Sequence, residues 1–106
     1  MDLVLGVPLV DQARSYRAVS ARLVEALPRD AGCIARRNVG DAQRALLDYF
    51  AKVRTVPFDA PEAARCGALL LQAAPLRIPE VGSPWVEAWR GSRPGDRHEL
   101  FILYRK

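Results

Sequence analysis

Two cysteines, Cys33 and Cys66, are the residues whose possible chemistry is easiest to define. Each opens a predicted β-strand, and if those strands are parallel neighbours they start at the same end of a sheet. The two sulfur atoms would then lie within bridging range. The pattern predicts a disulfide if the chain folds in an oxidising compartment, and two buried free thiols if it folds in a reducing one.

A second group of candidates surrounds the turn Asn-Val-Gly-Asp at residues 38–41, between a predicted strand and a predicted helix. Open α/β folds bind ligands at this position, where a helix N-terminus faces the carboxyl end of a strand. The turn has one glycine where a dinucleotide fingerprint needs three. The residues therefore fit either a turn that only starts a helix or a contact with an anion or a sugar. The candidate ligand-binding residues are Arg36, Arg37, Asn38, Gly40 and Asp41.

No other group of residues in the sequence defines a reaction. His98 is the single histidine, and no serine or cysteine occurs in a recognisable nucleophile motif, so we assign no catalytic residue and no cofactor. No Cys-x-x-Cys pair is present, and a metal site is not expected. Trp85 and Trp89 are predicted to share one face of a strand. They fit a covered sheet edge or, alternatively, a platform for stacking a sugar.

Composition predicts one folded domain. The chain has 106 residues, of which 50% are hydrophobic and 26% are charged, and its formal net charge is +4. Its basic residues are mostly arginines spread along the chain, with no run longer than two. This pattern favours a solvated basic surface over a dedicated polyanion site, and we do not expect nucleic acid as a partner.

Two amphipathic helices are predicted. The first is capped by Asp11 and ends at Leu27, before Pro28. Its buried stripe consists of Tyr16, Val19, Leu23 and Leu27. The second follows the turn at residues 38–41, and one face is expected to pack on a sheet. That face comprises Ala42, Ala45, Leu46, Tyr49, Phe50 and Val53.

The remaining pattern predicts a small α/β fold. Strands are expected at residues 33–39, 54–58 and 68–73, with the apolar run Ala-Leu-Leu-Leu-Gln-Ala at the centre of the sheet. A short helix begins near Asp59, and an ordered loop occupies 74–84. Residues 85–93 and 98–105 form a hairpin. The result is a sheet of about five strands, the first three parallel through a βαβ crossover and the C-terminal antiparallel hairpin at the edge, with two main helices packed on it.

The opening residues are unusual. Residues 1–10 are mostly apolar but lack the basic start and the cleavage site of a signal peptide. We interpret them as the end of a transmembrane span or as an apolar lead-in. Residues 11–106 would form a single soluble domain.

Several stretches together resemble a known family. These are Leu-Val-Asp-Gln-Ala-Arg-Ser-Tyr-Arg, Ala-Gly-Cys-Ile-Ala, Gly-Asp-Ala-Gln-Arg-Ala-Leu-Leu-Asp-Tyr-Phe, a Cys before a Leu-rich strand, and Arg-Pro-Gly-Asp-Arg with a closing Phe-Ile-Leu-Tyr-Arg. The combination resembles the C-terminal extracytoplasmic domain of bacterial membrane glycosyltransferases. The type is that of the dolichyl-phosphate-mannose protein mannosyltransferases, relatives of the aminoarabinose transferase that modifies lipid A.

The resemblance implies an accessory domain without catalysis of its own. The whole enzyme would move a sugar from a polyprenyl-phosphate donor to a lipid A or protein acceptor. An acidic residue in an early periplasmic loop of that enzyme would act as the catalytic base or anchor, and no position of this sequence matches it. The domain would lie on the periplasmic side of the inner membrane, as a monomer when isolated and without a cofactor. Its partners would be the transmembrane portion of the same enzyme and lipid headgroups or the sugar acceptor. A periplasmic location also favours the disulfide. The alternative is a free-standing cytosolic α/β module that binds a nucleotide or a phosphorylated metabolite.

Overall fold

The computed structural model describes residues 9–29, 32–52, 54–93 and 97–106. The elements in chain order are α1 (Leu9–Ala26), β1 (Ile34–Arg37), α2 (Asp41–Ala51), β2 (Thr55–Pro57), the 3-10 helix η1 (Pro61–Arg65), β3 (Ala68–Ala73), β4 (Val86–Gly91) and β5 (Leu100–Arg105). Residues 1–8 lie outside the described residues, so the interpretation of residues 1–10 stays a prediction. Among the described residues, no helix is long and apolar enough to cross a membrane.

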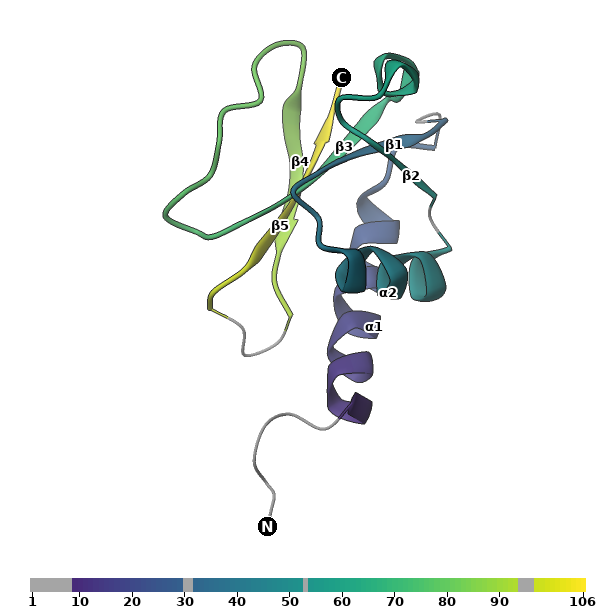
Figure 1. Cartoon of the computed structure of the whole chain (residues 1–106), viewed down its shortest axis with the longest axis vertical. Helices are drawn as coiled ribbons and strands as arrows, with labels where there is room; N and C mark the ends of the chain where they lie inside the picture. Colours follow the sequence, from purple (N-terminus) through teal and green to yellow (C-terminus); the bar gives the residue numbers. More distant parts are fainter. Residues whose placement is uncertain (1–8, 30–31, 53, 94–96) are drawn as a thin grey trace.

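Five strands form one mixed sheet in the order β2-β1-β3-β5-β4 (Figure 1). β1 pairs in parallel with both β2 and β3, and Ile34 lies opposite Thr55 on one side and Ala68 on the other. β5 runs antiparallel to β3 and to β4. The predicted fold class is therefore confirmed, including the parallel first three strands and the antiparallel hairpin at one edge.

Both helices pack on the same face of this sheet. The predicted stripe of α1 is confirmed, since Tyr16, Val19 and Leu23 are buried and Leu27 is partly buried against them. The ring of Tyr16 meets the edge of Phe101 with their centroids 6.3 Å apart. The buried residues of this helix-side core are Tyr16, Val19, Leu23, Ile34, Leu47, Ala68, Leu70, Phe101 and Leu103.

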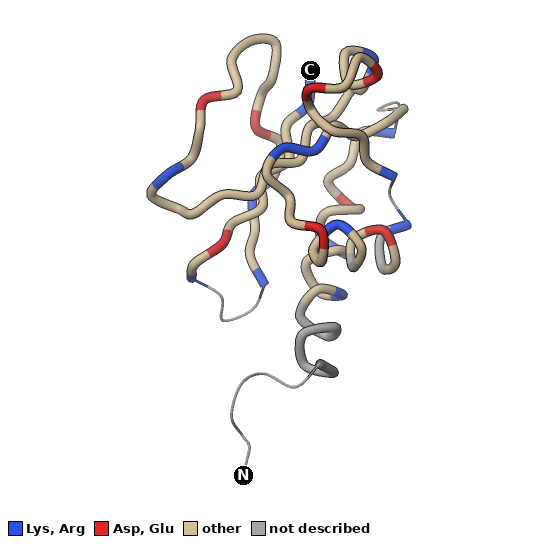
Figure 2. Tube along the Cα trace, viewed as in Figure 1, with Lys and Arg blue, Asp and Glu red and all other residues tan. Residues whose placement is uncertain are grey.

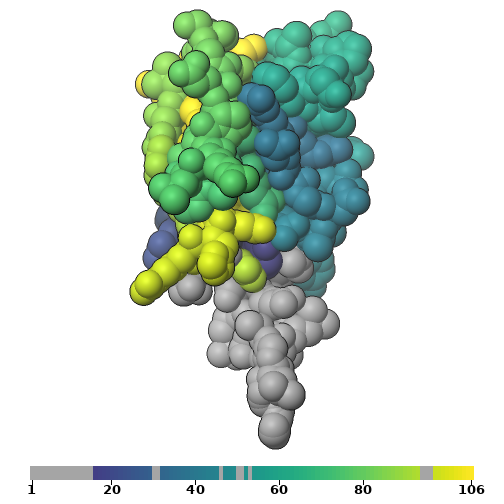
Figure 3. Space-filling model, turned by 60° about the vertical axis from the view of Figure 1, so that its left-hand side comes forward, coloured from purple at the N-terminus to yellow at the C-terminus, as the bar shows by residue number. Residues whose placement is uncertain are grey.

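The opposite face of the sheet is covered by η1 and by the loop between β3 and β4. Ala63 of η1 and Cys66 are buried there against Leu69, Leu71 and alternate residues of β5. Ile78, Val81 and Trp85 are partly buried against the same cluster. The side chains of the loop, drawn in green, form an outer layer on this side of the molecule (Figure 3). Because β3 is covered on both faces, its sequence is apolar at successive positions rather than alternating.

The predicted inward face of α2 is wrong at the three of its positions whose side chains the structure describes. Ala42 and Ala45 are exposed and Tyr49 is 74% exposed, whereas Leu47, which is not part of the predicted face, is buried. The side chains of Leu46, Phe50 and Val53 lie outside the described residues, so that part of the prediction stays a prediction. α2 packs against α1 as well as over the sheet, so its inner side is turned toward the space between them. Periodicity identified an amphipathic helix, but the neighbouring helix determined which side is buried.

The predicted cap of the first helix is also wrong. α1 begins at Leu9, so Asp11 lies inside the helix instead of capping it. The helix therefore starts three residues earlier than a cap at Asp11 would place it. The N-cap of α2 is Gly40, which has no side chain to make a capping bond.

Trp85 and Trp89 lie on opposite faces of the sheet, contrary to the prediction that they share one. Glu87 pairs with Tyr104 and Trp89 with Leu103, so Ala88 is an extra residue in β4. A bulge of this kind interrupts the alternation of side chains along a strand. Trp85 therefore packs against the cluster under the loop, whereas Trp89 packs against the helix-side core.

Candidate functional site

Arg36 and Arg37 are neighbours in β1, and their side chains diverge as successive strand residues do. Nη1 of Arg36 donates hydrogen bonds to the carbonyl oxygen of Thr55 at 2.7 Å and to its hydroxyl at 3.0 Å. Nη1 of Arg37 instead donates to the carbonyl of Glu80 at 3.3 Å, and its guanidinium lies 5.3 Å from the ring centroid of Phe58. The two guanidinium groups therefore do not converge on one point.

The predicted turn candidates are only partly brought together. A shallow cavity of about 370 Å³ lies at the carboxyl ends of β1 and β2. Arg36, Arg37 and Asn38 line it, with Val39, Pro57, Phe58 and Asp59. Gly40 and Asp41 do not line this cavity. Asn38 adopts a positive φ of 61°, a backbone region that asparagine tolerates better than most residues.

Gly40 and Asp41 instead lie at the start of α2. Gln72, far away in the sequence, forms a hydrogen bond there. The N–H of Gly40 donates to Oε1 of Gln72, on β3, at 3.1 Å. Gln72 is buried, and its Nε2 donates to Glu99. The side chain of Asp41 is 98% exposed, with Oδ1 3.8 Å from Nη2 of Arg44. The turn is thus tied to the sheet by Gln72, and one of its backbone N–H groups already has a partner.

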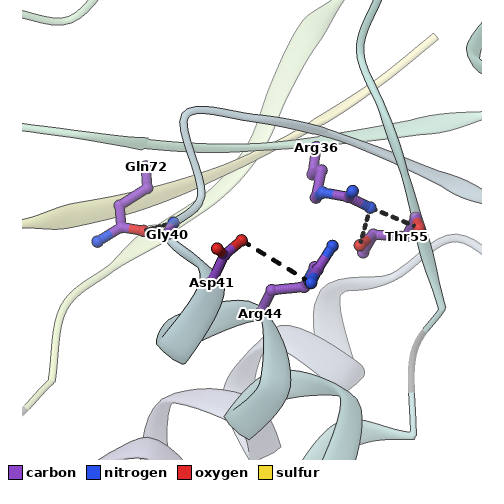
Figure 4. A network of polar contacts seen from close by, with 6 residues as sticks. All are labelled: Arg36, Gly40, Asp41, Arg44, Thr55 and Gln72. Carbon is purple, nitrogen blue, oxygen red and sulfur yellow. Dashed lines mark hydrogen bonds and ion pairs between the residues drawn. The ribbon is translucent and has the colours of Figure 1, made fainter. Parts of the chain in front are cut away.

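A second pocket, which we call the arginine pocket, lies between α2 and the β1–β2 edge of the sheet. Its volume is about 300 Å³, and its lining consists of Arg36, Arg44, Ala45, Asp48, Arg54 and Thr55. Figure 4 shows the side chains of Arg36 and Arg44 extending from opposite sides toward the space between the strands and the helix. Three guanidinium groups therefore surround one small cavity that contains a single carboxylate.

The arginine pocket adjoins a larger cavity, with which it shares two lining residues. This neighbouring cavity, which we call the apolar annex, has a volume of about 670 Å³ and shares Arg54 and Thr55 with the arginine pocket. It adds two cations, Arg29 and Lys52. Its other lining residues are Leu27, Pro28, Gly32, Cys33, Ile34 and Val56. The two cavities combine a small cationic pocket with a larger cavity whose walls are partly apolar.

The lining of these two cavities carries an excess of positive charge. It contains five cations and one carboxylate: Arg29, Arg36, Arg44, Lys52, Arg54 and Asp48. In Figure 2 blue segments of β1, α2 and the start of β2 lie on this side of the molecule, with red segments of α2 among them. The lining of the two cavities therefore has a net charge of +4.

Sequence reasoning missed Arg44 and Arg54 as candidates for this site. Arg44 is not on the predicted inward face of the second helix, and Arg54 is one of the arginines spread along the chain. Their proximity depends on the crossover that places α2 beside β2, which no local motif reveals. The predicted βαβ unit was a signal that could have placed these two arginines near each other, because such a unit brings its helix back over the strands that flank it.

Cys33 and Cys66 form a disulfide, with an S–S distance of 2.05 Å and Cα atoms 4.6 Å apart. They precede β1 and β3, which pair in parallel with Ile34 opposite Ala68. The prediction from paired strand starts is confirmed. Cys66 is fully buried, so this bond also forms part of the core under η1.

Shifted pKa values occur at the other edge of the sheet, on β4 and β5. Burial raises the pKa of the Tyr104 phenol above its ordinary value of 10.0, and the charge of Glu87 adds to that shift. Glu87 is bonded to Arg90 at 2.8 and 3.0 Å, and these bonds lower the pKa of the Glu87 carboxyl. Since β4 and β2 are at opposite edges, these groups are remote from the arginine pocket.

Within the described part of the chain, no group of three or more His, Cys, Asp or Glu side chains could hold a metal ion. His98 is exposed. No protein-family profile, curated protein or solved structure matches the chain.

Proposed function

We propose that this chain is the accessory C-terminal domain of a bacterial membrane glycosyltransferase that uses a polyprenyl-phosphate sugar donor, and that it lies on the periplasmic side of the membrane. The observation that supports this most is the disulfide between Cys33 and Cys66. Disulfides persist in oxidising compartments such as the bacterial periplasm. Both cysteines also fall in the stretches that carry the resemblance, Ala-Gly-Cys-Ile-Ala and the Cys before the Leu-rich strand.

The proposed role is recognition of the acceptor or assembly of the enzyme, not transfer of the sugar. No position of the sequence matches the family's catalytic acidic residue, the base or anchor that the resemblance assigns to an early periplasmic loop of the whole enzyme. The excess of cations in the lining of the two cavities supports a contact with anionic groups, including phosphorylated lipid headgroups. The domain would bring such groups close to the transmembrane portion of the same enzyme.

The genomic sequence upstream of codon 1 tests this proposal. We expect an open reading frame that continues upstream through several apolar segments of about 20 residues each. A stop codon with a ribosome-binding site directly before Met1 would overturn the proposal. The accessory role has its own test, because sugar transfer by the purified chain from a polyprenyl-phosphate donor would contradict it.

A second candidate function is a free-standing cytosolic module for a nucleotide or a phosphorylated metabolite. It is favoured by one observation, the cavity that Arg36, Arg37 and Asn38 line at the carboxyl ends of parallel strands. Retention of the chain on a nucleotide resin, together with free thiols at Cys33 and Cys66 in freshly prepared cytosolic extract, would favour this function over the first. Absence of retention and an oxidised pair would contradict it.

A further inference from the structure

We infer that the arginine pocket binds a phosphate group, as a monoester or a diphosphate, through Arg36, Arg44 and Arg54. This inference goes beyond the proposed function, because it concerns one cavity of this chain and holds whether or not the chain belongs to a transferase. Guanidinium groups are suited to the role, since their planar N–H donors match phosphate oxygens in pairs.

The first argument is that charge in the pocket is not balanced. Arg36 bonds to oxygens of Thr55, which are uncharged. Arg44 is paired with Asp41, which at 3.8 Å and 98% exposure is a weak partner in water. Asp48 is the single carboxylate in a lining with three arginines. Cations that converge in this way repel one another unless an anion lies between them, so the pocket is complementary to an anion with more than one negative charge.

The second argument is that one arginine is already held in place. Both hydrogen bonds from Arg36 to Thr55 are made by Nη1. A guanidinium has five N–H donors, so those on Nη2 and Nε are left for a ligand. β2 is paired with β1 beside it, which fixes Thr55 relative to Arg36. Arg36 would therefore lose little side-chain freedom on binding, and this favours affinity.

The third argument concerns size and what lies next to the pocket. At about 300 Å³ the arginine pocket has room for a small group, at the lower end of ligand-site volumes. The apolar annex begins at Arg54 and Thr55, and Leu27, Ile34 and Val56 contribute to its walls. A ligand with its phosphate in the arginine pocket could place an apolar remainder in the annex. This arrangement fits a phosphate-bearing amphiphile as well as a small soluble phosphate compound.

Binding of pyrophosphate and of inorganic phosphate to the chain, measured by isothermal titration calorimetry at low salt, tests the pocket directly. Co-flotation with phosphatidylcholine vesicles, with and without phosphatidic acid, tests the same chemistry on a lipid headgroup. Binding to pyrophosphate alone indicates a soluble ligand. Binding to phosphatidic acid vesicles alone indicates a lipid, and binding to both indicates that the phosphate suffices. Any of the three supports the inference.

The decisive comparison uses two double variants with the same loss of charge. Arg44→Gln/Arg54→Gln removes two cations of the pocket, and Arg65→Gln/Arg77→Gln removes two exposed arginines of η1 and the β3–β4 loop. All four side chains are exposed, so folding should be kept, as checked by circular dichroism. We expect binding to weaken by about tenfold or more in the pocket variant and by less than about twofold in the control. Equal weakening in both variants, or no binding of any probe to the unchanged chain, would overturn the inference.

Discussion

Gln72, near the end of β3, accepts a hydrogen bond from the backbone N–H of Gly40, the residue that precedes α2. The amide nitrogen Nε2 of the same side chain donates to the carboxylate of Glu99, just before β5. One buried amide therefore joins the turn after β1 to two strands of the sheet. This relationship explains why a polar residue occupies the otherwise apolar run of β3.

Replacing this amide should destabilise the fold. In Gln72→Leu the N–H of Gly40 loses its partner in a partly buried turn, and we expect the free energy of unfolding to fall by about 1–3 kcal/mol. Urea unfolding measures the change. The companion variant Gln72→Glu keeps an acceptor for Gly40 but places a second carboxylate beside Glu99. Its stability should recover as the pH is lowered and these carboxylates are protonated. Unchanged stability in Gln72→Leu would show that the amide has no structural role.

Removing the disulfide should have a larger effect. The bond joins residues 33 positions apart, and the chain-entropy account gives about 4 kcal/mol for a loop of this length. We expect Cys33→Ala/Cys66→Ala to unfold at a correspondingly lower urea concentration than the oxidised chain. A reductant should lower the stability of the unchanged chain and leave the double variant unaffected. Mass analysis without reductant should give two hydrogen atoms fewer than after reduction. Two alkylated thiols in the oxidised protein would contradict the bond.

Gly91 should not accept a side chain while Trp89 stays in place. A Cβ atom at Gly91 would come 2.5 Å from Cζ2 and 2.9 Å from Cη2 of the Trp89 indole. Trp89 packs against the helix-side core, so moving the ring disturbs that packing. We expect Gly91→Ala to lower the free energy of unfolding by about 1–3 kcal/mol. In a Trp89→Leu background the same change should cost much less, and equal costs in both backgrounds would refute the steric account.

Tyr104 should make stability fall at alkaline pH. Because its pKa is raised in the folded state above 10.0, the folded protein holds the phenolic proton more tightly than the unfolded chain does. This contribution is complete below pH 10 and is lost as the pH rises through the raised pKa. Thermal unfolding at a series of pH values from about 9 upward measures the slope. Tyr104→Phe should make it shallower, and identical slopes would contradict the assignment.

Local patterns predicted most of the architecture. The apolar run predicted the bounds of β3, and the 3.6-residue spacing predicted the buried stripe of α1. The positions of the two cysteines at the starts of strands predicted the disulfide. Each of these depends on residues close in sequence or on one pairing of adjacent strands. Such features are encoded several times over, by composition, periodicity and turn residues together.

The features that sequence reasoning missed depend on how whole elements meet. The buried side of α2 was determined by α1, and the sides of Trp85 and Trp89 by one extra residue in β4. The arginine pocket needs residues from a strand, a helix and the approach to another strand, none of them adjacent in sequence. Arg36 and Arg37 are both candidate ligand-binding residues in the sequence. Because side chains alternate along a strand, Arg37 points instead toward the β3–β4 loop.

The disulfide has one more consequence for the arginine pocket. All six residues that line the pocket lie between Cys33 and Cys66 in the sequence, so the pocket is built within a covalent ring. A protease that cuts the backbone once inside that ring opens it without releasing a fragment. The strand side and the helix side of the pocket would stay tethered to each other through sulfur. Nicked chains could thus keep their full mass until a reductant separates the two pieces.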